Sequence, residues 1–195
     1  GLSCVMLLKQ VVAQSPGGVK NHIVWQKEFG GNDYKVNGND LFNFHSYKYF
    51  KDEFDGFDQQ IPELNKISIF MVFSSNTKSD IGVISTGKSD LLLNDSSLTS
   101  SKILKYVDTD LKPKFLSYVE KFNSLKESSQ FPAISFGGNN SSTESIFRGG
   151  ISEIIIYDRL ISKLQRKKIE SYLSLKYGIS LPDSSDYINS NGDKI

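Results

Sequence analysis

The fold is decided by residues 147–182, FRGGISEIIIYDRLISKLQRKKIESYLSLKYGISLP. Within this stretch, residues 150–157 are dense in isoleucine and end on a tyrosine, a composition typical of a β-strand. Asp158 and Arg159 follow at once and interrupt the apolar run. The stretch therefore predicts a strand that turns, within a few residues, into the element that comes next.

That next element is a helix with both of its ends marked in the sequence. Ser162 and Gln165 have the spacing of a capping box, in which each side chain binds the other residue's backbone N–H. Gly178 stands where a left-handed residue commonly ends a helix, and Pro182 prevents the helix from resuming. These signals predict a helix at about 162–177.

The predicted helix is amphipathic, which places it on the surface of the protein. At 100° per residue, its larger apolar side chains fall on one half of the wheel, and most of its charged and hydroxyl side chains fall on the other. The apolar half, which we expect to face the protein, holds Leu164, Ile169, Tyr172, Leu173 and Leu175. The polar half, which we expect to face solvent, holds Arg166, Lys167, Glu170, Ser171 and Ser174.

Upstream of residue 147 the sequence contains short strand-like runs separated by turn residues, which is typical of an all-β sandwich. The run at 66–74 (KISIFMVFS) is the densest and predicts a central strand buried on both faces. The runs at 81–85 and 90–93 predict a hairpin. The remaining predicted strands are residues 22–29, 41–44, 114–122 and 132–136. We therefore expect two antiparallel sheets packed face to face, with one late amphipathic helix.

The composition excludes several classes of function. The 23 lysine and arginine residues nearly balance the 22 aspartate and glutamate residues, so a nucleic acid or an anionic membrane surface is not an expected partner. The single cysteine, Cys4, allows no disulfide within the chain and no cysteine-built zinc site. No apolar run approaches 18 residues, so we expect no membrane insertion.

The strand and helix of residues 147–182 resemble the last strand and helix of laminin-G-like domains in the concanavalin A-like lectin/glucanase superfamily. The closest likeness is to a variant found in secreted multidomain proteins of Bacteroidota, with a strand motif E-[IV]-[IV]-[IV]-Y and a helix that ends in Y-L-x-x-K-Y-G-[IV]-x-L. The matching positions are Glu153, Ile154, Ile155, Ile156, Tyr157, Tyr172, Leu173, Lys176, Tyr177, Gly178, Ile179 and Leu181. The resemblance implies a jelly-roll sandwich over residues 15–182.

The two ends of the chain are interpreted separately from the sandwich. Residues 1–14 resemble the end of a secretory signal peptide, with an apolar stretch and then small residues; a first strand over residues 5–12 is the alternative. Residues 183–195 resemble the segment that joins this kind of module to the next one. We expect neighbouring modules in a longer chain and a secreted or cell-surface bacterial location, with export by type IX secretion.

No catalytic residue is expected. A retaining glycoside hydrolase needs two carboxylates about 5–5.5 Å apart, and no pair in the sequence has suitable spacing on one strand face. Glu153 and Asp158 are five positions apart, which sends them to opposite faces of a strand. We interpret Glu153 as a structural residue that holds a backbone turn or a basic side chain.

One loop, around residues 47–58, holds the candidate binding residues. Its acidic side chains Asp52, Asp55 and Asp58 could supply oxygen ligands to calcium, although their spacing is not that of an EF-hand. Its aromatic side chains Tyr47, Tyr49 and Phe54 are candidates for a ligand-contact surface. A solvated acidic loop and structural packing of the aromatic rings are the alternatives.

We therefore expect a non-catalytic binding or adhesion module whose partner is a glycan or a cell-surface protein. Two alternatives stay open: a structural spacer in a surface fibre, and a glycan hydrolase on the same fold. A binding module is expected to expose Tyr47, Tyr49 or Phe54 beside a concavity. A spacer is expected to expose no such cluster, and an enzyme to place two carboxylates together in a cleft.

Overall fold

The computed structural model describes residues 15–29, 43, 45–50, 57–75, 80–85, 90–94, 114–121, 132–136, 148–181 and 185–195. In these ranges the chain forms mainly strands, with a short 3₁₀ helix at the start and one α-helix near the end. The elements are η1 (Pro16–Gly18), β1 (Ile23–Glu28), β2 (Lys48–Phe50), β3 (Phe57–Gln60), β4 (Lys66–Ser75), β5 (Asp80–Ser85), β6 (Asp90–Asn94), β7 (Lys114–Lys121), β8 (Ala133–Phe136), β9 (Gly149–Tyr157) and α1 (Lys163–Tyr177).

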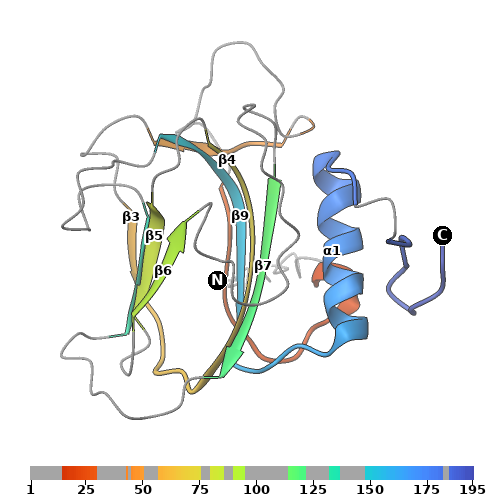
Figure 1. Ribbon diagram of the computed structural model, residues 1–195, viewed down its shortest axis with the longest axis horizontal. Coiled ribbons are helices and arrows are strands. Elements are labelled where there is room, and N and C mark those ends of the chain that lie inside the picture. Colours follow the sequence, from red (N-terminus) through yellow and green to blue (C-terminus); the bar gives the residue numbers. More distant parts are fainter. Residues whose placement is uncertain are drawn as a thin grey trace, which may run out of the picture.

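The strands form two antiparallel sheets. The first sheet has the order β1-β9-β4-β7, and β2 also pairs with β9; the second sheet has the order β3-β8-β5-β6. Figure 1 shows the second sheet, the first sheet and α1 as successive layers, with residues 185–195 beyond the helix. Two antiparallel sheets with one late helix are thus confirmed, as is the hairpin of β5 and β6. The predicted strand at 41–44 lies, apart from Asn43, outside the described residues.

A β-bulge at Ser152 marks the point where β1 gives way to β2 as the neighbour of β9. Val72 pairs with Glu153 and Phe73 with Ile151, so Ser152 is the extra residue. Its carbonyl accepts the N–H of Phe29, just after β1, at 2.8 Å. Its hydroxyl donates to the carbonyl of Ser46, just before β2, at 2.6 Å. The bulge also reverses the alternation of side chains along β9.

The inner core lies between the two sheets and is apolar. Alternate residues of β4 point into it, and the bulge lets β9 contribute residues from both sides of Ser152. From the second sheet, β8 supplies Ile134 and Phe136, each with no exposed surface. The inner-core residues from the first sheet are Phe50, Ile67, Ile69, Met71, Phe73, Leu116, Ile151, Ile154 and Ile156.

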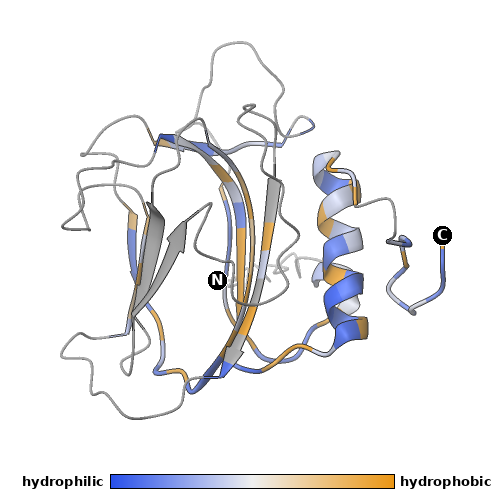
Figure 2. Cartoon of the chain, in the orientation of Figure 1, coloured by the Kyte–Doolittle hydropathy of each residue, from blue (hydrophilic) through white to orange (hydrophobic). Residues whose placement is uncertain are grey.

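The outer core lies between the first sheet and α1. Phe70 and Val72 of β4 and Ile155 and Tyr157 of β9 meet helix residues that include Leu173. Because β4 supplies side chains to both cores, the prediction of a central strand buried on both faces is confirmed. In Figure 2 the apolar residues are concentrated along β4 and β9, whereas α1 alternates between polar and apolar positions.

The helix ends are as predicted. Ser162 and Gln165 make both hydrogen bonds of the capping box, and Gly178 has φ of 65°, the left-handed conformation that glycine adopts without strain. The helix axis also lies near β7, where the Arg166 guanidinium donates to the carbonyl of Ser117 at 3.1 Å. Both boundaries are set by residues within the helix or next to it.

The predicted orientation of the helix was only partly right: Ile169 and Leu173 are buried as expected. Leu164 and Leu175 are 52% and 57% exposed, whereas Glu170, Ser171 and Ser174 are buried. Two of these polar side chains have a hydrogen-bond partner in their buried positions. Glu170 accepts from Arg166 at 2.7 Å, and the Ser171 hydroxyl accepts the N–H of Ile188 at 3.0 Å. Polar side chains with partners tolerate burial, so Glu170 and Ser171 can be buried although hydrophobicity alone would expose them.

Within the described ranges, no helix is long and apolar enough to cross a membrane. The segment 1–14, interpreted above as the end of a signal peptide, lies outside the described residues.

Candidate functional site

The three aromatic candidates do not form one described cluster. Tyr47 is 6% exposed and belongs to the outer core, which removes its ring from the predicted contact surface. Burial, and next the charge of Tyr49, raise the pKa of Tyr47. Tyr49 lies on β2 and is 38% exposed. Phe54 lies outside the described residues, so Tyr49 is the aromatic candidate that the described residues leave available to a ligand.

Of the three residues predicted to bind calcium, the structure describes Asp58 alone. Asp58 is exposed on β3 and pairs with Ser135 of β8, whose hydroxyl donates to the Asp58 carboxylate. Asp52 and Asp55 lie outside the described residues. In the part of the chain that the structure describes, no group of three or more histidine, cysteine, aspartate or glutamate residues is placed to hold a metal ion. Calcium at this loop stays a prediction.

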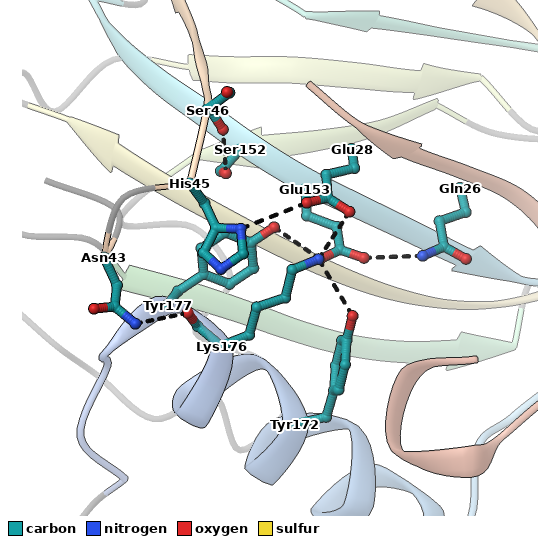
Figure 3. Close-up of polar contacts among 10 residues, drawn as sticks. All are labelled: Gln26, Glu28, Asn43, His45, Ser46, Ser152, Glu153, Tyr172, Lys176 and Tyr177. Carbon is teal, nitrogen blue, oxygen red and sulfur yellow. Dashed lines mark hydrogen bonds and ion pairs between the residues drawn. The ribbon is translucent and has the colours of Figure 1, made fainter. Parts of the chain in front are cut away.

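The most developed polar site is instead a cluster around Glu153, where β1, β9 and the last turn of α1 meet (Figure 3). The Glu153 side chain has no exposed surface. Its Oε1 accepts from the Gln26 amide at 2.9 Å. Its Oε2 accepts from the Lys176 ammonium at 3.0 Å and from the Tyr177 hydroxyl at 2.9 Å. A buried carboxylate is costly unless donors compensate it, and here three donors do so.

Lys176 joins this buried carboxylate to a second, partly exposed one. Its Nζ lies 3.0 Å from Glu153 and 2.8 Å from Glu28, whose side chain is 48% exposed. It also donates to the Tyr172 hydroxyl at 3.2 Å. Burial by itself would lower the pKa of Lys176, but the hydrogen bond to Glu28 and the charge of Glu153 outweigh it and raise that pKa. The ammonium is therefore held in its charged form.

Tyrosine rings enclose the Lys176 side chain. Its Nζ lies 5.5 Å from the ring centre of Tyr172 and 5.1 Å from that of Tyr177, within the range of cation–π attraction. Burial is the largest cause, and the charge of Glu153 the second, of the raised pKa of both tyrosines. Both hydroxyls therefore keep their protons well beyond neutral pH.

The outer rim of the cluster is formed by two residues that precede β2. The His45 ring lies 4.9 Å from the Tyr177 ring, and its Nδ1 is 3.6 Å from Glu28 Oε1. The Asn43 amide donates to the carbonyl of Lys176 at 3.0 Å, at the C-terminal end of the helix. Figure 3 shows both side chains beside the last helical turn, on the same side as Tyr177.

This arrangement is suited to holding the helix on the sheet. Both oxygens of Glu153 are occupied, and the carboxylate is closed to solvent. The interpretation of Glu153 as a residue that holds a basic side chain is confirmed by its contact with Lys176. Sequence reasoning missed Gln26, Glu28 and His45. No local signal marks Glu28, because it reaches Glu153 only through the register of β1 on β9, which places the two residues opposite each other.

A second polar contact joins the residue just before β1 to the residue just after β9. His22 Nδ1 lies 3.0 Å from Asp158 Oδ1, and both side chains are about half exposed. The Asp158 N–H also donates to the carbonyl of His22 at 3.1 Å. This pair closes the edge of the sheet and has no contact with the Glu153 cluster in the hydrogen bonds and ion pairs of the described residues.

The comparisons with known proteins bear on the C-terminal part of the chain. A family model described as a domain of unknown function (DUF8202) matches residues 165–195. The match begins at the third residue of α1 and extends through residues 185–195, so it includes Tyr172, Lys176 and Tyr177 of the cluster. No curated protein and no solved structure matches the chain.

Proposed function

We propose that the chain is a non-catalytic binding module of a secreted or cell-surface bacterial protein, with a laminin-G-like jelly-roll fold and a glycan or a surface protein as its ligand. The observation that supports this proposal is the exposed ring of Tyr49 on β2. Tyrosine combines a flat apolar ring with a polar tip, and it is enriched in the buried centres of interfaces.

The surroundings of Tyr49 favour it as a contact residue. Its partner in the register of β2 on β9 is Gly150, which has no side chain to cover the ring from that strand. The nearby residues Tyr47 and Phe50 are buried, in the outer and inner cores respectively, and hold β2 against the sheet. A ligand would therefore meet a ring on a rigid strand, which lowers the entropy lost on binding.

The Glu153 cluster supports a non-catalytic role. Glu28 and Glu153 come together, but the ammonium of Lys176 lies between them and Glu153 is inaccessible to a substrate. A hydrolytic acid and base must both reach the scissile bond. A structural spacer is the second candidate function, favoured by the use of this cluster to hold α1 on the sheet.

The test is binding of the full chain to a glycan array and to a panel of immobilised extracellular proteins. For any ligand found, Tyr49→Ala is expected to weaken binding about fivefold or more, because truncation of an aromatic residue at the centre of an interface costs more than about 1 kcal/mol. Leu164→Ala is the matched control, since it removes another exposed apolar side chain and is expected to leave binding unchanged.

Three results would contradict the proposal in different ways. No binding on either surface favours the spacer. Unchanged binding by Tyr49→Ala places the ligand site elsewhere on the chain. Release of reducing sugar from an arrayed glycan would show a hydrolase.

A further inference from the structure

Residues 185–195, named here the C-terminal strap, lie across α1 on the side away from the sheet (Figure 1). Ile188 is 8% exposed, and its N–H donates to the buried hydroxyl of Ser171 at 3.0 Å. The Lys168 ammonium donates to the carbonyl of Ser190 at 2.7 Å. The Tyr187 hydroxyl accepts the N–H of Leu181, just after the helix, at 3.1 Å. The strap is thus bound to the helix at Lys168 and Ser171 and to the segment after the helix at Leu181.

The strap is shaped by its own hydrogen bonds. The Asn189 side-chain oxygen accepts the backbone N–H groups of residues 191, 192 and 193, each at 2.9 Å. Ile188 and Lys194 form a short antiparallel bridge, and the Asn189 N–H donates to the carbonyl of Asp193 at 2.8 Å. A turn closed in this way presents Ile188 and the Ser190 carbonyl to the helix with little further loss of entropy.

The strap also reaches the beginning of the module. Ser190 lies against Gly18 of η1, where an added Cβ would be 3.0 Å from the Ser190 Cβ. Gly17, in turn, lies against the helix so closely that a Cβ there would be 2.5 Å from the carbonyl carbon of Lys168. Gly17 has φ of 57°, so both its backbone conformation and this close approach require glycine. The 3₁₀ helix, α1 and the strap therefore meet at Lys168.

We propose that the C-terminal strap is a lock: its contacts hold η1 and α1 together on the outer face of the first sheet and slow the local opening of α1. The burial of Ile188 and its hydrogen bond to Ser171 explain why Ser171 is buried although it lies on the side of the helix away from the sheet. The family match over residues 165–195 independently spans the helix and the strap as one unit of sequence. The lock assigns residues 185–195 to the module itself, whereas the sequence predicts a linker or a next module from residue 183.

The test is amide hydrogen exchange on the full chain, comparing the wild type with Ile188→Ala. Local opening sets the exchange rate of each protected amide. If the strap is a lock, Ile188→Ala speeds exchange about tenfold at residues 188–192 and also at residues 169–174 of α1, and leaves β4 unchanged. Ser171→Ala, which removes the hydroxyl that accepts the Ile188 N–H, is expected to act in the same direction. Asn191→Ala changes an exposed side chain of the strap and is the control.

Three outcomes would overturn the lock. The first is faster exchange in the strap with unchanged exchange in α1, which would make the strap a passive appendage. The second is an equal increase in β4, which would show a general loss of stability instead of a local one. The third is an Ile188 amide in the wild type that exchanges as fast as an unstructured peptide. None of these measurements depends on a ligand, so the lock and the proposed binding function fail separately.

Discussion

The two faces of the first sheet are both buried, but the layers that cover them differ in chemistry. The inner face meets the second sheet through aliphatic and aromatic side chains. The outer face meets α1 through a mixed layer, in which Glu153, Ser68 and Ser174 are buried beside apolar residues. Ser68 illustrates the difference: its hydroxyl donates to the Arg159 carbonyl at 2.6 Å and accepts the Ile161 N–H at 3.0 Å, which positions the turn into the helix.

This difference shows that the burial of the first sheet and the rotation of α1 have separate physical causes. Burial of apolar surface stabilises the packing on both faces, by roughly 25 cal/mol per Å² of surface removed from water. A helix on an apolar surface has several rotations of similar energy, and a buried polar group is satisfied in few of them. On the outer face the polar contacts therefore select the rotation, whereas on the inner face the pleat of the two sheets already sets which side chains meet.

The largest effects are expected where a fully buried apolar side chain is truncated, as in Ile154→Ala. Ile154 and Glu153 are neighbours on β9, both with no exposed surface, and point to opposite faces. Ile154→Ala leaves a cavity in the inner core and is expected to lower the free energy of unfolding by about 3 kcal/mol. Glu153→Gln keeps the shape but loses charged hydrogen bonds, and is expected to cost about 2 kcal/mol.

Urea unfolding of the full chain measures both values, and Ile154→Val serves as the milder inner-core control. A larger loss for Glu153→Gln than for Ile154→Ala would reverse the comparison and make the outer face the main source of stability.

A smaller effect is expected from alkaline pH, and it arises at described residues of the outer face. Burial first, and the Glu153 charge second, raise the pKa of Tyr157 and Tyr177, so the folded protein keeps these protons when the unfolded chain has lost them. The raised pKa of Lys176, set by Glu28 and Glu153 against the cost of burial, acts in the same direction. Stability is therefore full below about pH 10 and falls as the pH rises above it.

The measurement is the urea midpoint at about pH 8 and about pH 11, with the slope set by the difference in bound protons. Tyr177→Phe is expected to reduce the fall, and Ile154→Val to leave it unchanged. An equal fall in wild type and Tyr177→Phe would mean that the Glu153 cluster does not supply the pH dependence.

The smallest effect is expected at the exposed leucines of α1. Leu175→Ala, at a side chain 57% exposed, is expected to change the free energy of unfolding by less than about 0.5 kcal/mol. Leu173→Ala, two positions away and with no exposed surface, is expected to cost about 3 kcal/mol. Both are measured by urea unfolding. Similar losses at the two positions would restore the helix orientation that hydrophobicity predicts.

The candidate site was predictable only in part. Glu153 was identified as a structural carboxylate because its strand offered no second carboxylate at a catalytic spacing. Its partner Lys176 lies in the predicted helix, but nothing local relates position 176 to position 153. Gln26 and Glu28 reach the site through the pairing of β1 with β9, between segments more than 100 residues apart. The aromatic contact residues were proposed from their loop, and the packing of β2 on β9 then buried Tyr47 and exposed Tyr49.

The sequence by itself determined the elements whose signals are local: the helix from Ser162 to Gly178, whose caps are bonded within four residues, and the strands with dense β-branched residues. It also predicted two antiparallel sheets with one late helix, but it placed β2 and the start of β3 in a loop. Only the tertiary structure decided which face α1 buries, where the Ser152 bulge reverses β9, and that Glu28, Glu153 and Lys176 meet. The physical reason is that capping and strand propensity act over neighbouring residues, whereas register and helix rotation depend on satisfying polar groups from distant segments at once.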